Sequence, residues 1–174
     1  MKDSKLAKEI LRRVETEQKI RKASIGGKAK RSDYKKLDRQ NSTWLKTLFA
    51  EHGWPTFSLI GKKAADGVWL MVQHADHDLT FQKSSLALMR KLFTRQPHEV
   101  SKMRIAYLTD RIRMNEKKPL IFGIMYKVDG LKVSPYPIQN PNEVNKRRKE
   151  FGIKTTVEGR RRALIRELKK LGAK

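Results

Sequence analysis

The stretch that decides the fold class is Leu120-Ile121-Phe122-Gly123-Ile124-Met125-Tyr126-Lys127-Val128-Asp129-Gly130. Its first seven residues form an apolar run without a helical period, which favours a strand. Asp129-Gly130 is a strong indication of a two-residue β-hairpin turn, because such turns need backbone conformations that these residue types tolerate. A return strand is expected over residues 131–136, with Pro135 and Pro137 marking its edge or end. One antiparallel hairpin is therefore predicted.

Helical patterns precede this hairpin. The first helix is expected from Ser4 to about Lys22, because apolar residues recur there at every fourth position. A second helix is predicted to be capped by Ser32 or Asp33. Gly53 should end it, since glycine suits the left-handed conformation that follows many helices.

Further helices complete the expected fold. They are predicted over about residues 61–75, after a cap at Asp78, and from Pro97, which suits a first helical turn. Beyond the hairpin, residues 155–158 (Thr-Thr-Val-Glu) resemble a capping box, so a basic C-terminal helix is expected over about residues 156–172. Its narrow apolar stripe consists of Leu164, Leu168 and Leu171. The predicted class is α+β, mostly α: a helical domain with one antiparallel β-hairpin.

Length and composition limit the remaining possibilities. A chain of 174 residues with 38% hydrophobic residues is long enough to bury a core as one domain over residues 1–174. The absence of cysteine excludes disulfides, thiolate metal sites and a cysteine nucleophile, and fits a reducing compartment. No apolar run approaches the roughly 20 residues that span a bilayer, and no secretory leader pattern follows Met1. A cytoplasmic protein without a membrane partner is expected.

The positive charge predicts an anionic partner. Lys and Arg number 41 against 18 Asp and Glu, a formal net charge of +23. Residues 1–40 carry 14 basic and 6 acidic side chains, and residues 142–174 carry 12 and 4. Self-repulsion on this scale costs stability, so a polyanion that compensates it is plausible. The expected nucleic-acid-binding residues are Lys28, Lys30, Arg31, Lys35, Arg160, Arg161, Arg162, Arg166, Lys169 and Lys170.

The densest cluster of titratable residues is Gln73-His74-Ala75-Asp76-His77-Asp78. On a helix, His74 would share a face with His77 and with Asp78. That spacing permits two metal ligands, or a histidine oriented by a carboxylate for acid–base chemistry. A metal needs three or four ligands and the sequence offers no obvious third, so neither a metal nor a cofactor is expected. The structural alternative is a helix end, in which Asp76 or Asp78 caps the next helix.

A second polar pair, Asp110 and Arg111, sits on an otherwise apolar helical pattern. Buried polar groups need partners, so we expect Asp110 to lie close to His74, with Arg21 or Arg111 within reach. The candidate catalytic residues are His74, Asp76, Asp110 and Arg111. A buried network of ion pairs that only ties helices together is the alternative, and whether the protein is an enzyme stays open.

Several short motifs occur in a defined order. They are Glu17-Gln18-Lys19-Ile20-Arg21, Asp38 with Asn41, Gly53-Trp54-Pro55, Gln73-His74-Ala75-Asp76, Phe81-Gln82 and Leu108-Thr109-Asp110-Arg111. This order, over about residues 6–153, resembles an uncharacterised bacterial family, domain of unknown function 6624. The family usually has Gln-x-Tyr-Gly-Thr-Gln at the hairpin, where this chain has Leu120-Ile121-Phe122-Gly123-Ile124-Met125. If those polar groups serve chemistry in the family, this chain has lost or altered it. The resemblance supplies no known activity.

Three functions fit the sequence. The first is a module that binds nucleic acid, with RNA slightly favoured, through phosphate contacts that need no base-reading motif. The second is a hydrolase or phosphodiesterase, for example a toxin-like nuclease, that uses the His/Asp/Arg residues. The third is a basic protein that docks on an acidic protein partner.

Overall fold

The structure is a computed structural model that describes residues 3–25 and 29–172. It is helical apart from one two-stranded antiparallel hairpin, which confirms the predicted mostly α, α+β class. The chain divides into two compact units, Met1–Ser101 and Lys102–Lys174, and the sequence-based expectation of one domain stays a prediction. No helix among the described residues combines the length and apolar character that a membrane crossing requires.

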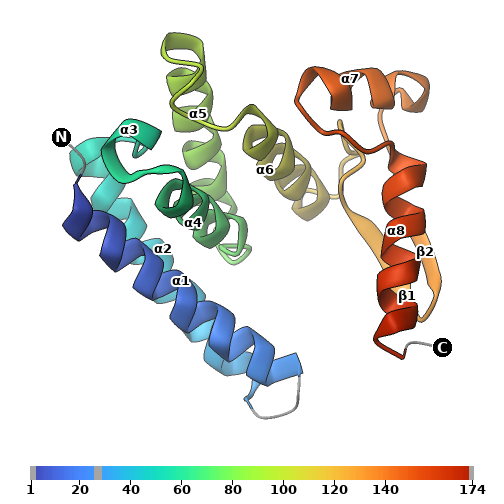
Figure 1. Cartoon of the computed structure of the whole chain (residues 1–174), viewed down its shortest axis with the longest axis horizontal. Coiled ribbons are helices and arrows are strands. Elements are labelled where there is room, and N and C mark those ends of the chain that lie inside the picture. Colours follow the sequence, from blue (N-terminus) through green and yellow to red (C-terminus); the bar gives the residue numbers. More distant parts are fainter. Residues whose placement is uncertain (1–2, 26–28, 173–174) are drawn as a thin grey trace. The chain divides into compact units, whose positions relative to one another are not determined.

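The first unit is built on a helical hairpin. Helices α1 (Ser4–Ile25) and α2 (Arg31–His52) pack side by side (Figure 1). They are followed by α3 (Phe57–Ile60), α4 (Lys62–Gln73) and α5 (Leu79–Arg95). Helix α4 packs against both α1 and α2. This arrangement brings the end of α4 to the two helices that carry the polar residues discussed below.

Glycine allows α4 to pack closely on α1. A Cβ atom at Gly67 would lie 3.0 Å from the Val14 side chain and 3.1 Å from that of Ile10. The helix also contributes much of the apolar core of this unit, because Val68 and Val72 are fully buried. Close packing of α4 on α1 therefore fixes the position of the residue that follows α4, which is His74.

The predicted ends of these helices are confirmed in part. Asp78 caps α5, since its Oδ1 accepts a hydrogen bond from the backbone N–H of Phe81 at 2.9 Å. Gly53 ends α2 with a φ of 65°. The predicted start of α2 is wrong, because the helix begins at Arg31 with Lys30 as its N-cap. Asp33 lies inside the first turn, and its carboxylate accepts from the backbone N–H of Lys30 at 2.9 Å.

The predicted helix start at Pro97 is also wrong. Helix α5 ends at Arg95 with Gln96 as its C-cap, and the next helix begins only at Lys102. The intervening turn is held by α3, which the sequence did not predict. The backbone carbonyl of Glu99 accepts from the N–H of Phe57 at 3.2 Å, and its carboxylate accepts from the N–H of Ser58 at 2.7 Å. These contacts hold Glu99 outside a helix.

The second unit combines helices with the hairpin. Its elements are α6 (Lys102–Asn115), β1 (Tyr126–Asp129), β2 (Lys132–Pro135), the 3-10 helix η1 (Pro141–Glu143), α7 (Val144–Glu150) and α8 (Val157–Lys170). Ala106, Phe122 and Ile153 form a buried apolar cluster in this unit. Helix α8 packs against β2.

The two-residue hairpin turn lies one residue later than the predicted Asp129-Gly130, and the first strand is shorter than predicted. The last cross-strand pair is Asp129 with Lys132, so the two-residue loop consists of Gly130 and Leu131. Gly130 has a φ of 53°, as its place at the first central position of a tight turn requires. The apolar run predicted as a strand forms one only at Tyr126.

Residues 120–125 do not form a strand because their polar backbone groups are bound elsewhere. The fully buried carboxylate of Asp110 accepts hydrogen bonds from the N–H groups of Ile121 at 2.8 Å, Phe122 at 3.1 Å and Ile124 at 2.9 Å. Buried Arg148 donates to the carbonyls of Phe122, at 2.8 Å, and Gly123, at 3.3 Å. The side chains of Asp110 and Arg148 thus take up backbone N–H and carbonyl groups that a strand would use to pair with a neighbouring strand.

The C-terminal helix begins one residue later than the predicted capping box. Thr156 is the N-cap, and its hydroxyl accepts from the N–H of Gly159 at 3.0 Å. The hydroxyl of Thr155, the predicted cap, instead accepts from Nη2 of Arg148 at 3.0 Å. Of the predicted apolar stripe, Leu164 and Leu168 are half-buried, whereas Leu171 is 83% exposed.

Candidate functional site

His74 does not lie on a continuous helix with its acidic and histidine neighbours. Helix α4 ends at Gln73, and His74 is its C-cap. The predicted shared helical face with His77 and Asp78 is therefore absent. His77 instead pairs with the Ser42 hydroxyl on α2, at 3.0 Å from its Nε2, whereas His74 is directed at α1.

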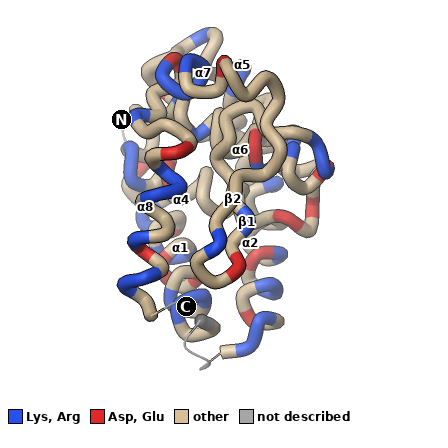
Figure 2. The backbone as a smooth tube through the Cα atoms, turned by 90° about the vertical axis from the view of Figure 1, so that its right-hand side faces the viewer, with Lys and Arg blue, Asp and Glu red and all other residues tan. Residues whose placement is uncertain are grey.

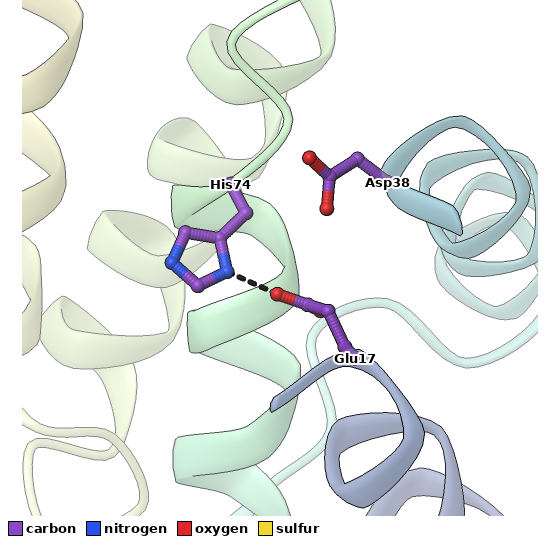
Figure 3. A group of neighbouring side chains, drawn as sticks. All are labelled: Glu17, Asp38 and His74. Atoms are coloured by element: carbon purple, nitrogen blue, oxygen red, sulfur yellow. Dashed lines mark hydrogen bonds and ion pairs between the residues drawn. The ribbon is translucent and has the colours of Figure 1, made fainter. Parts of the chain in front are cut away.

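The partner of His74 is Glu17 on α1. The fully buried carboxylate of Glu17 is hydrogen-bonded to Nδ1 of His74 (Figure 3). The same carboxylate accepts from Nε of Arg21 at 2.9 Å and from the side-chain amide of Asn41 at 3.4 Å. Glu17 therefore joins three polar side chains that come from three helices or helix ends.

Arg21 extends this network to α2. Its Nη2 lies 2.5 Å from Oδ1 of Asp38, which is itself buried. Its guanidinium also lies over the Tyr34 ring, 4.7 Å from the ring centre. One arginine thus bridges the two buried carboxylates beside His74, which balances charge that would otherwise be costly in this position.

The two carboxylates have pKa values shifted in opposite directions. Burial alone would raise the pKa of Glu17, but the hydrogen bond and charge of His74, together with those of Arg21, hold it below its usual value. Burial raises the pKa of Asp38 and outweighs the opposing effect of Arg21. A pair of neighbouring carboxyl groups with diverging pKa values is a feature of acid–base sites.

The arrangement at His74 suits proton transfer. If Nδ1 carries its proton and donates it to Glu17, Nε2 has a free lone pair. Figure 3 shows this second ring nitrogen facing away from both carboxylates. The His74 side chain retains 21% exposure, so it is not sealed in the core. The geometry is that of a histidine whose tautomer and orientation are set by a buried carboxylate.

The same residues could also ligate a cation. Glu17, Asp38 and His74 each offer one ligand atom, and these atoms lie within 4.8 Å of one another. Arg21 already contacts both carboxylates. A metal ion would therefore have to displace its guanidinium.

Each of the other three predicted catalytic residues has surroundings of its own within its unit. Asp76 is exposed, and its carboxylate accepts from the side-chain amide of Gln82 at 3.4 Å. Asp110 belongs to the second unit, where both its oxygens bind backbone N–H groups, and Arg111 follows it on α6. The predicted proximity of His74 and Asp110 stays a prediction.

Sequence reasoning named His74 but did not place Glu17 or Asp38 in the candidate set. A periodic signal was present, because Glu17 follows Ile10 and Val14 at spacings of seven and three residues. Those spacings place a carboxylate on the apolar face of α1. A buried carboxylate on such a face requires a partner, although the spacing does not say which residue that partner is.

The cations predicted to bind nucleic acid occur at two places. Lys30, Arg31 and Lys35 are exposed around the start of α2, and Lys28 lies outside the described residues. On α8, Arg160 pairs with Glu167 at 2.8 Å and Arg161 with Glu158 at 2.7 Å. Exposed cations on α8 that form no ion pair with any described residue are Arg162, Arg166, Lys169 and Lys170. Figure 2 shows Lys and Arg positions spaced along this helix.

Comparison with known proteins identifies the family. A sequence model described as a family of unknown function, DUF6624, matches residues 4–168. Neither the curated proteins nor the solved structures gave a match to the chain. The matched segment includes nearly every described residue of both units. The chain therefore belongs to the family of unknown function DUF6624.

Proposed function

We propose that the protein binds the phosphate backbone of nucleic acid, with RNA slightly favoured over DNA. The observation that carries this proposal is the set of four exposed cations on α8, Arg162, Arg166, Lys169 and Lys170, none of which forms an ion pair with a described carboxylate. A further group of exposed cations, Lys30, Arg31 and Lys35, surrounds the start of α2. Such side chains bind phosphates regardless of sequence and release condensed counterions as they do so.

The formal net charge of +23 supports this reading. The acidic residues of α8, Glu158 and Glu167, each bind a neighbouring arginine of the same helix. They therefore leave the other cations available. An acidic protein partner would satisfy the same charge, but a repeating phosphate backbone does so without a complementary fold.

A charge-matched pair of variants tests which cations bind. The first neutralises α8 through Arg162→Gln, Arg166→Gln, Lys169→Gln and Lys170→Gln. The control removes the same charge from exposed lysines on other helices, through Lys8→Gln, Lys62→Gln, Lys63→Gln and Lys91→Gln. For single-stranded RNA, the slope of the logarithm of affinity against the logarithm of salt concentration should become shallower by up to about 3 in the α8 variant. Each phosphate contact contributes about 0.7 to this slope.

The control should keep a slope close to that of the wild type. Equal slopes for the α8 variant and the wild type would eliminate α8 as the binding element. Substitution is preferable to truncation at residue 157, because Val157 is buried and its carbonyl accepts from the Tyr126 hydroxyl at 2.8 Å. Binding to an acidic protein but to no nucleic acid would favour the docking alternative.

A second candidate function is phosphodiester hydrolysis, and the Glu17–His74 pair favours it. In this reaction Nε2 of His74 takes a proton from water as the water oxygen bonds to phosphorus. The bond from phosphorus to the leaving oxygen breaks, and Nε2 returns the proton to that oxygen. Glu17 holds the imidazole in the required tautomer and stabilises its protonated form.

Cleavage of labelled single-stranded RNA would test this candidate. His74→Ala should lower the rate by about 100-fold or more, the usual contribution of general acid–base catalysis, and should leave RNA binding intact. His77→Ala is the matched control, because His77 is the neighbouring histidine and contacts Ser42 instead of Glu17. An unchanged rate in His74→Ala would assign the pair a purely structural role.

A further inference from the structure

An open groove lies between α1 and α2 in the first unit. Its volume is about 640 Å³, within the range of about 300–1,000 Å³ that small-ligand sites occupy. Residues that line it include Arg12, Arg13, Arg39 and Trp44, with side-chain amides and hydroxyls from the same two helices. No carboxylate occurs among the described residues of the lining. The groove therefore combines positive charge, an aromatic ring and neutral hydrogen-bonding groups.

The charge of the groove is only partly neutralised. Glu9 binds both Arg12, at 2.8 Å, and Arg13, at 2.7 Å. Its pKa falls to about 2, chiefly through its hydrogen bond with Arg12, so it stays ionised at neutral pH. Arg39 is exposed and forms no ion pair with any described residue. Two arginines therefore share one carboxylate, and a third remains available to an anion.

Trp44 contributes a planar surface to this groove. Trp44 is only half-buried, whereas the other two tryptophans, Trp54 and Trp69, are 6% and 7% exposed. The guanidinium of Arg13 lies over the Trp44 ring, 4.4 Å from its centre. Nucleobases stack on aromatic rings and on arginine planes alike.

Asn41 holds this surface in place and connects it to the candidate site. Its Oδ1 accepts from Nη1 of Arg13 at 3.3 Å, and its amide donates to Glu17. Asn41 is fully buried, so the stacked pair rests on a side chain that cannot rotate freely into solvent.

We propose that the groove between α1 and α2 binds a nucleotide unit of a single-stranded nucleic acid, with the base against Arg13 and Trp44 and the phosphate at Arg12 and Arg39. This inference rests on the proposed nucleic-acid binding and adds to it a site that requires an unpaired base. The α8 cations contact phosphate alone, whereas this groove distinguishes a nucleic acid from other polyanions. Duplexes, whose bases are already stacked, should occupy it poorly.

The test compares oligoadenylate RNA with heparin, a polyanion that has no bases, at one salt concentration. Trp44→Leu should weaken oligoadenylate binding by between about 5-fold and about 100-fold, the usual effect of removing one stacking residue. It should leave heparin binding and the salt slope unchanged, because no charge is removed. Trp44→Phe should recover part of the loss. Oligoadenylate, but not heparin, should quench tryptophan fluorescence in the wild type, and Trp44→Phe should abolish that quenching.

The outcomes separate the two proposals. If Trp44→Leu binds oligoadenylate as tightly as the wild type does, the groove proposal is overturned, whatever the α8 variant does. If oligoadenylate binds no better than heparin and leaves the fluorescence unchanged, the groove takes no base. If the wild-type protein binds neither ligand at low salt, both proposals fail. Quenching of the wild type tests the groove even if Trp44→Leu does not fold.

Discussion

Replacement of Glu17 by glutamine should destabilise the first unit strongly. The carboxylate is fully buried and binds Arg21 at 2.9 Å, His74 and, more weakly, Asn41 at 3.4 Å. The side-chain oxygen of glutamine can still accept a hydrogen bond from one of these groups. Its NH2 group would face another of the donors, and two donors cannot form a hydrogen bond with each other. Hydrogen bonds to charged groups contribute about 1.5–3 kcal/mol each. The ion pair between Arg21 and Asp38 would remain and limit the loss. We therefore expect the free energy of unfolding to fall by about 2–4 kcal/mol at neutral pH.

The loss should depend on pH in a defined direction. The pKa of Glu17 is lower in the folded protein than its ordinary value of 4.5, so its ionised form favours folding. Its contribution is complete above that ordinary value and disappears as the pH falls through the lower, folded-state pKa. The difference between wild type and Glu17→Gln should therefore be largest near neutrality and should shrink in acid.

Urea unfolding followed by tryptophan fluorescence measures this difference, because all three tryptophans lie in the first unit. Glu15→Gln on the same helix is the matched control, since Glu15 is exposed and pairs with exposed Lys19, at 3.3 Å; such surface pairs contribute little. A difference below about 1 kcal/mol for Glu17→Gln, or one that stays constant down to the acid limit, would refute the buried network.

Two further substitutions test the fold. Gly123→Ala should lower stability by about 2 kcal/mol or more in thermal unfolding followed by circular dichroism, because φ is 61° and a Cβ would lie 2.7 Å from Ile138. Gly152→Ala, with a φ of 74° and no atom near its Cβ, should cost less, and equal losses would contradict the steric argument. Asp78→Ala should cost about 1 kcal/mol through loss of its cap on Phe81; an unchanged urea midpoint would show that this bond contributes nothing.

Local signals in the sequence predicted the parts of the fold that depend on a few neighbouring residues. The Asp78 cap, the end of α2 at Gly53 and the turn at Gly130 follow from backbone preferences and hydrogen bonds within four residues. The predicted class followed from these elements. The sequence singled out His74, but not its buried partner Glu17.

Errors arose where a distant side chain bound the backbone. The apolar run from Leu120 was predicted as a strand, but Asp110 binds its N–H groups and Arg148 its carbonyls. At α8 the predicted cap residue Thr155 accepts a hydrogen bond from Arg148, and Thr156 is the cap. Neither partner can be read from a local pattern. The same holds for the Glu17–His74 pair, which joins residues 57 positions apart.

The measurement that tests the central claim most directly is the affinity of the full chain for single-stranded RNA as a function of salt concentration. If about five cations engage phosphates, the log–log slope should be near −3.5, and affinity should fall by about 100-fold between 50 and 200 mM salt. The four exposed α8 cations and the three around the start of α2 offer more contacts than this number requires. No binding at low salt, or an affinity that does not change with salt, would contradict the account.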